Sequence, residues 1–180
     1  MIMPLSVEEA RMDKLREFVE ADISKEQALY FGRTMAGNAE VVEILWRFVQ
    51  ENKTPLSWRA MWYLEHLCEQ DREVLRPLVP RIIEQLPHFK HDGQKRSGLK
   101  TIAMFPLSGF DYGPLLTVCF DFLLDSGESI AVRSLSMQQL YEICRIEPEL
   151  SDELRQSILH ILPEASKGIQ AKARHILGKL

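Results

Sequence analysis

The chain has 180 residues, of which 46% are hydrophobic and 27% are charged. This composition excludes an intrinsically disordered chain, and the length predicts one independently folding domain that spans residues 1–180. The 22 basic and 26 acidic side chains give a net charge of -4, which excludes a uniformly basic surface of the kind that coats nucleic acid.

No apolar segment approaches the roughly 18 residues that a membrane-spanning helix needs. The N-terminal residues also lack the basic start and the apolar run of a signal peptide, so we expect a cytoplasmic protein that does not enter a membrane. Cys68, Cys119 and Cys144 are an odd number of widely spaced cysteines inside apolar helical patterns. We interpret them as buried hydrophobic residues in a reducing compartment rather than as disulfide partners or metal ligands.

Helix signals begin in the first third of the chain. Ser24 followed by Gln27 predicts a capping box, in which the hydroxyl accepts from a backbone N–H of the first turn. Asn38 predicts the cap of a second helix with a continuous apolar stripe. Thr54 and Pro55 predict a cap followed by proline at the first helical position, where the missing N–H costs nothing.

Asp71 predicts the start of a further helix, whose apolar residues recur at three- and four-residue spacing as far as Leu86. Pro77 and Pro80 lie inside this segment and predict either a regular helix from Pro80 onward or a kink. Helical spacing continues to the end of the chain, whereas no segment alternates with period two for long enough to form a sheet. The predicted fold class is therefore all-α.

Internal repetition distinguishes a stacked array from a bundle. Four predicted helices align on a basic residue, and Arg59, Arg96, Arg133 and Lys172 are 37, 37 and 39 residues apart. This predicts about five antiparallel helix pairs whose apolar faces are covered only by their neighbours. The expected parts are a leading helix at about 6–20, repeats at about 22–51, 54–87, 92–125 and 128–163, and a terminal helix at 166–180. Two alternatives remain for the terminal helix, which either caps the core or meets another subunit.

The repeat length, the helical hairpins and the Val132-Arg133 step at a second helix resemble HEAT repeats. The resemblance covers residues 22–180 and implies a right-handed α-α superhelix of the armadillo type. It also implies that Asp125, in the turn within a repeat, pairs with Arg133. HEAT-like proteins act mostly as scaffolds and adaptors, so the resemblance implies a protein or peptide partner.

The predicted helix at 55–70 contains the most distinctive candidate for a binding surface. Ala60, Leu64, Leu67 and Cys68 share the side expected in the core. The other side holds two indoles and three polar side chains: Trp58, Trp62, Glu65, His66 and Glu69. Either a neighbouring repeat or the N-terminal helix around Leu15 and Phe18 covers the indoles, or they anchor a partner on a concave surface.

A basic segment follows, with Lys90, Lys95, Arg96 and Lys100 against the single acid Asp92. It is interpreted either as a solvated helix start or as a surface for phosphate or an acidic protein. His88 and His91 also lie here, but no second group of ligands accompanies them. Since phosphate-loop, dinucleotide-binding, nucleophile-elbow and zinc-protease motifs are all missing from the sequence, we predict no metal, no cofactor and no catalytic residue.

Two hypotheses for function follow. The first is a non-catalytic scaffold that presents a concave surface to a protein or peptide. The second is an enzyme similar to the HEAT-like DNA glycosylases of alkylation repair, in which Trp58, Trp62, Glu65 and Arg96 would meet the damaged nucleotide. The net charge of -4 disfavours the second hypothesis, because tight binding of nucleic acid requires many neutralised phosphates.

Overall fold

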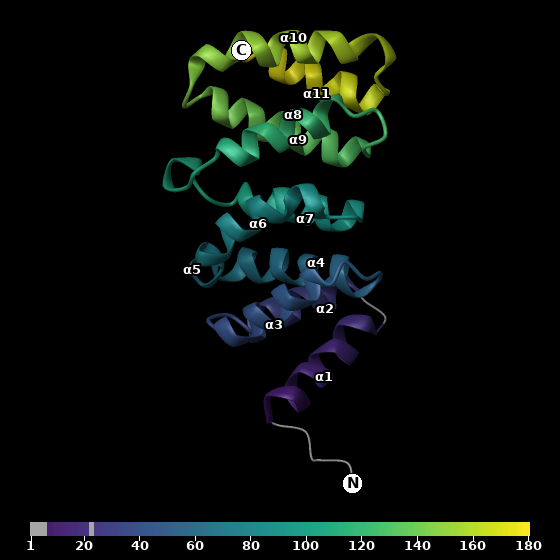
Figure 1. Ribbon diagram of the computed structural model, residues 1–180, viewed down its shortest axis with the longest axis vertical. Coiled ribbons are helices and arrows are strands. Elements are labelled where there is room, and N and C mark those ends of the chain that lie inside the picture. The colour runs from purple at the N-terminus through teal and green to yellow at the C-terminus, as the bar shows by residue number, and fades with distance from the viewer. Residues whose placement is uncertain (1–6, 22–23) are drawn as a thin grey trace. The chain divides into compact units, whose positions relative to one another are not determined.

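The computed structural model describes residues 7–21 and 24–180. All regular secondary structure within these ranges is helical, in agreement with the predicted all-α class (Figure 1). The chain forms two compact units, residues 1–77 and 78–180, which we call unit 1 and unit 2. The expected repeat at 54–87 has residues in both units. The expected ranges 6–20 and 22–51 open on residues that lie outside the described part of the chain.

Unit 1 contains the helices α1 (Val7–Glu20), α2 (Lys25–Thr34), α3 (Ala39–Gln50), α4 (Leu56–Gln70) and α5 (Arg72–Leu75). Ser24 and Asn38 cap α2 and α3 as predicted, since each side-chain oxygen accepts from a first-turn N–H at 3.1 Å. Thr54 does not cap α4. The Ser57 hydroxyl stabilises the turn before α4 instead, because it accepts from the Lys53 N–H and donates to the Phe48 carbonyl.

Helix α4 lies at the centre of unit 1 and packs against α1, α2 and α3. Its predicted core residues Ala60, Leu64, Leu67 and Cys68 are all fully buried. On another side of α4, Tyr63 packs with Phe18 of α1 and Phe31 of α2, with ring centroids 4.9 to 5.4 Å apart. Such aromatic clusters combine a large buried area with favourable ring geometry, so they connect the two N-terminal helices to α4.

Unit 2 contains the helices α6 (Val79–Gln85), α7 (Asp92–Ile102), α8 (Gly113–Leu124), α9 (Ile130–Cys144), α10 (Ser151–Ile161) and α11 (Lys167–Leu177). Pro80 lies in the first turn of α6. The regular helix therefore begins at the prolines, which is the first of the two predictions for this segment. Helix α11 packs against α9 and buries Ile169, Ala173 and Ile176. Helix α11 therefore covers part of the core of unit 2.

Two of the aligned basic residues contact backbone carbonyls rather than carboxylates. Arg133 donates from Nε to the carbonyl oxygen of Leu123, at 3.0 Å, near the end of α8. The expected Asp125–Arg133 ion pair does not occur between these two described residues, and Asp125 accepts from the N–H of Gly127. Arg59 donates in the same way to the carbonyls of Glu20 and Ala21, at the end of α1. A cation at a helix C-terminus satisfies carbonyls that have no partner within the helix.

All three cysteines are free and buried, as predicted. Burial raises the pKa of Cys68 to about 12, and it raises the pKa of Cys119 to about 12 as well. Because only the thiolate reacts, we expect both thiols at pH 8 to react with a disulfide reagent roughly a thousandfold more slowly in the folded protein than in urea. The rate of each reaction is measured from the absorbance of the released chromophore, with and without urea. A fast reaction of both thiols in the folded protein would contradict the prediction.

None of the described helices is both long and apolar enough to cross a membrane.

Candidate functional site

The side of α4 that carries the predicted indoles and polar residues is largely covered. Glu65 and His66 are 2% and 5% exposed, whereas Trp58 and Trp62 are half-buried and Glu69 is exposed. Helix α2 accounts for part of this cover, because Gly32 lies directly against the backbone of His66. Two of the three polar side chains expected to meet a partner are therefore in the interior.

His66 has its own partners within unit 1. Its Nδ1 lies 2.8 Å from a carboxylate oxygen of Glu69, and the Trp62 ring meets the imidazole edge-on with centroids 4.9 Å apart. The Nε2 atom has no hydrogen-bond partner within the described ranges. These contacts position the imidazole between α2 and the half-buried indole, so His66 contributes to packing on this side of α4.

The basic segment in unit 2 contains one residue with a structural role. Lys95 forms an ion pair with Glu128, and their side chains are only 15% and 8% exposed. The Lys95 ammonium also lies 4.9 Å from the centroid of the Phe122 ring, at a distance typical of a cation–π contact. Lys90, Arg96 and Lys100 are exposed. The exposed positive charges of this segment are therefore three rather than four.

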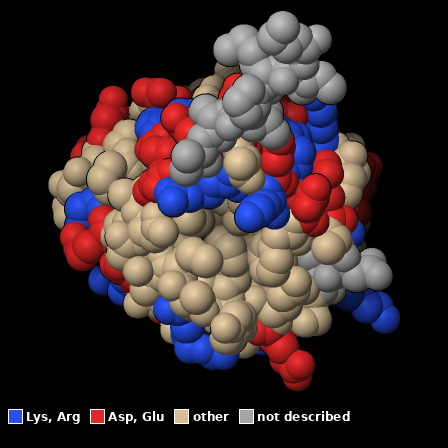
Figure 2. Space-filling model, turned by 90° about the horizontal axis from the view of Figure 1, so that it is seen from below, with Lys and Arg blue, Asp and Glu red and all other residues tan. Residues whose placement is uncertain are grey.

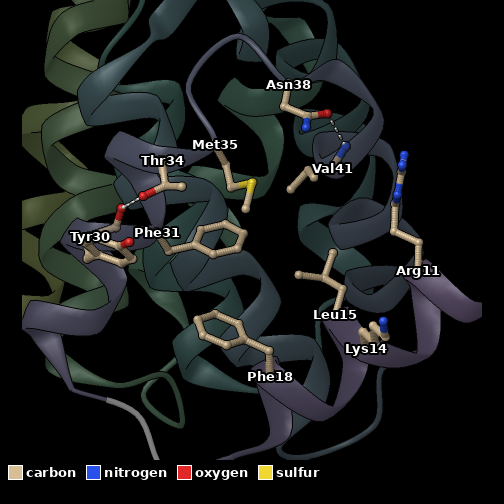
Figure 3. Close-up of a pocket in the computed structure, with 10 residues that line it drawn as sticks. All are labelled: Arg11, Lys14, Leu15, Phe18, Tyr30, Phe31, Thr34, Met35, Asn38 and Val41. Carbon is tan, nitrogen blue, oxygen red and sulfur yellow. Dashed lines mark hydrogen bonds between the residues drawn. The ribbon is translucent and has the colours of Figure 1, made fainter.

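Unit 1 also contains a pocket of about 460 Å³ between α1, α2 and the start of α3, which we call the unit-1 pocket. Figure 3 shows Leu15, Phe18, Phe31 and Met35 turned toward one another across this space. Its described lining residues are Arg11, Lys14, Leu15, Phe18, Tyr30, Phe31, Thr34, Met35, Asn38 and Val41. The volume lies within the range of small-ligand and side-chain sites, and the lining is predominantly apolar.

Polar contacts hold α1 in place as one wall of this pocket. Arg16 donates to both carboxylate oxygens of Glu51, at 2.5 and 3.2 Å, and its guanidinium lies 4.6 Å from the Phe48 ring centroid. The hydrogen bond to Arg16 lowers the pKa of Glu51 below its usual range. Arg59 holds the other end of α1 through the carbonyls of Glu20 and Ala21. Helix α1 is therefore held against the rest of unit 1 by contacts of Arg16 and Arg59.

The charged residues on the rim of the unit-1 pocket are cationic. Arg11 is paired with Glu40, whereas Lys14 is exposed and has no ion pair with any residue that the structure describes. Tyr30, on the opposite rim, is 64% exposed. Figure 2 views the molecule from the end where α1 lies in Figure 1, and it shows a broad uncharged area bordered by both basic and acidic side chains.

Leu15 and Phe18 were predicted to cover the indoles of α4 as one of two alternatives, but the pocket that they line was not predicted. Charged residues make up much of helix α1, and its Phe18 packs against Phe31 and Tyr63. The exposed Tyr30, one residue before Phe31 on α2, is the signal that could have indicated incomplete cover. The described lining includes no carboxylate, histidine or cysteine.

Metal-ligating residues do not gather in the part of the chain that the structure describes: no three or more His, Cys, Asp or Glu side chains come together there. His91 instead caps α7, with its Nδ1 accepting from the N–H of Gly93 at 2.9 Å. Of the four residues suggested to meet a damaged nucleotide, Trp58, Trp62 and Glu65 belong to unit 1 and Arg96 belongs to unit 2.

Residues 15–180 match the family model described as a HEAT repeat domain. Because this match covers most of the chain, the protein belongs to the HEAT repeat domain family, as the resemblance in its sequence implied. The match begins within α1, which also forms a wall of the unit-1 pocket. No curated protein and no solved structure matches the chain.

Proposed function

We propose that this protein is a non-catalytic HEAT-repeat interaction protein and that the unit-1 pocket docks an apolar segment of a protein or peptide partner. HEAT repeats commonly mediate protein interactions. The observation that carries the proposal is an apolar pocket of about 460 Å³ that stays open to solvent beside an exposed tyrosine. Exposed apolar surface of this kind marks interaction sites in folded proteins.

The rim of the pocket defines the preferred chemistry of the partner. Lys14 provides a positive charge without a counter-ion in the described part of unit 1, while Arg11 is already paired. A partner that places apolar side chains against Leu15 and Phe31 therefore gains from a carboxylate near Lys14. Complementary charge increases both the specificity and the rate of such association.

The test uses a synthetic helical peptide of about 18 residues, or five turns, with leucine along one face and glutamate elsewhere, which we call the Leu–Glu peptide. Lys14→Glu is expected to weaken its binding about tenfold, and Tyr30→Ala by a similar factor, because each removes an exposed contact at the rim. Fluorescence anisotropy of the labelled peptide measures both dissociation constants.

Lys25→Glu is the matched control, because Lys25 is exposed on the same unit and does not line the pocket. It carries the same change of charge as Lys14→Glu and should leave the affinity within about twofold. Equal losses in both lysine variants would show a general effect of charge, and no loss in any variant would exclude the unit-1 pocket as the docking site.

A further inference from the structure

Helix α8 in unit 2 is apolar on more than its buried side. Leu115, Val118, Cys119, Phe122 and Leu123 point into the core and are buried. A second row of apolar residues, spaced four apart along the same helix, adjoins that side: Leu116, Phe120 and Leu124. The first two are half-buried, and Leu124 is 46% exposed. A surface helix ordinarily carries polar residues at such positions, so this row is an apolar surface that its own unit covers only in part.

The row lines a groove between two helices. Helices α8 and α10 contact each other within unit 2. The groove beside them has a volume of about 310 Å³. Its described lining residues are Leu116, Thr117, Phe120, Asp121, Leu124, Glu153 and Ser157. Leu124 also lines a second pocket, of about 560 Å³, together with Ile130, which is 52% exposed. The apolar surface thus continues from Leu116 past the end of α8.

The charges beside the groove are acidic and unmatched. Asp121 and Glu153 are the charged residues among its described lining, both are exposed, and neither forms an ion pair with any residue of the described ranges. The second pocket adds the exposed Glu164 and the largely buried Glu128, together with Arg133 and His160. Glu128 is paired with Lys95, and its Oε2 atom lacks a hydrogen-bond partner in the described part of unit 2. A cationic partner complements the pair Asp121 and Glu153.

We propose that the groove between α8 and α10 docks a basic amphipathic helix. Its apolar side chains would lie on Leu116, Phe120 and Leu124, and its Lys or Arg side chains would meet Asp121 and Glu153. The four-residue spacing of the row favours a helical occupant, because apolar residues at that spacing match one face of a partner helix. The row extends about 12 Å, or two turns, along α8. This site does not depend on the unit-1 pocket, which has a rim of opposite charge.

The test compares three labelled peptides of equal length by fluorescence anisotropy. The Leu–Lys peptide has leucine in the positions of the Leu–Glu peptide and lysine elsewhere, and a scrambled version has the same composition with leucines spread around the helix. We expect the Leu–Lys peptide to bind the intact protein about tenfold more tightly than its scrambled version. Equal affinities would show attraction to the net negative charge alone and would overturn the proposal.

Paired variants then locate the site. Leu124→Ser should weaken Leu–Lys binding about fivefold, whereas Leu159→Ser should not, because Leu159 is equally exposed on α10 but does not line the groove. The double variant Asp121→Lys, Glu153→Lys should bind the Leu–Lys peptide more weakly and the Leu–Glu peptide more tightly than the parent protein does. Identical losses for the two leucine variants, or unchanged binding in the double variant, would exclude this groove.

The Lys14→Glu variant separates this proposal from the proposed function. It should weaken the Leu–Glu peptide and leave the Leu–Lys peptide unchanged, since Lys14 lines only the unit-1 pocket. One set of titrations therefore shows whether the proposal for the unit-1 pocket, the proposal for the α8–α10 groove, or both, are correct. A loss of Leu–Lys binding in Lys14→Glu would assign that peptide to unit 1 and overturn the inference for α8.

Discussion

Replacing Lys95 by methionine is expected to lower the free energy of unfolding by about 3 kcal/mol. Methionine keeps most of the volume of the stem but removes the ammonium that pairs with Glu128. The Glu128 carboxylate is only 8% exposed, so the variant leaves a charge inside the protein without its partner. Removing one member of a buried pair costs more than the pair itself contributes, because the remaining ion has already lost its hydration. Urea unfolding followed by circular dichroism measures the change.

Arg96→Met is the matched control for this prediction. Arg96 is the next residue along α7 and is exposed, so its variant should change the free energy of unfolding by less than about 0.5 kcal/mol. In the double variant Lys95→Met, Glu128→Leu the unpaired charge is gone, and most of the lost stability should return. A Lys95 variant as stable as the Arg96 variant would show that the pair is solvated.

This result also changes how the basic segment is tested for binding. A Lys95 variant that lost affinity for nucleic acid or for an acidic protein would combine a loss of contact with a loss of stability. Lys90 and Arg96 are exposed, so alanine at these two positions tests contact alone. Unchanged binding in that pair of variants would remove Lys90 and Arg96 from consideration as interface residues.

Gly32→Ala is expected to destabilise unit 1 by about 2 kcal/mol, although alanine ordinarily stabilises a helix by about 1 kcal/mol relative to glycine. A Cβ atom at position 32 would lie 2.7 Å from the carbonyl oxygen of His66 and 3.1 Å from its carbonyl carbon. Both are backbone atoms of α4, so no rotamer change relieves the overlap and the two helices must separate. Overpacking of this kind exceeds the gain in helix propensity.

Gly109→Ala provides the control, because no atom lies within 4 Å of a Cβ built at that position. Its free energy of unfolding should stay within about 0.5 kcal/mol of the parent protein. The Gly32 variant should also weaken the Leu–Glu peptide, since α2 provides Tyr30, Phe31 and Thr34 to the unit-1 pocket. Binding of the Leu–Lys peptide in unit 2 should be unaffected. An unchanged melting temperature for Gly32→Ala would contradict the close packing of α2 on α4.

Much of the fold was predictable because local signals and apolar spacing act over short distances in the chain. Ser24 and Asn38 cap their helices as expected, and Ala60, Leu64, Leu67 and Cys68 are buried as a row at helical spacing. The period of the basic residues predicted the repeat family that the comparison then identified. The pairing within each repeat was less predictable, since Arg133 satisfies a carbonyl where a carboxylate was expected.

Local patterns in the chain were enough to predict the helical class, the caps of α2 and α3, the core side of α4 and the resemblance to HEAT repeats. The burial of individual polar residues was not predictable, because the charge of a side chain does not show which neighbouring helix covers it. Glu65, His66 and Lys95 looked like surface residues, yet α2 approaches closely at Gly32 and Glu128 provides a counter-ion. The unit-1 pocket likewise depends on how much of α2 is covered by α1. The packing of the two helices sets this, and the sequence of neither helix shows it.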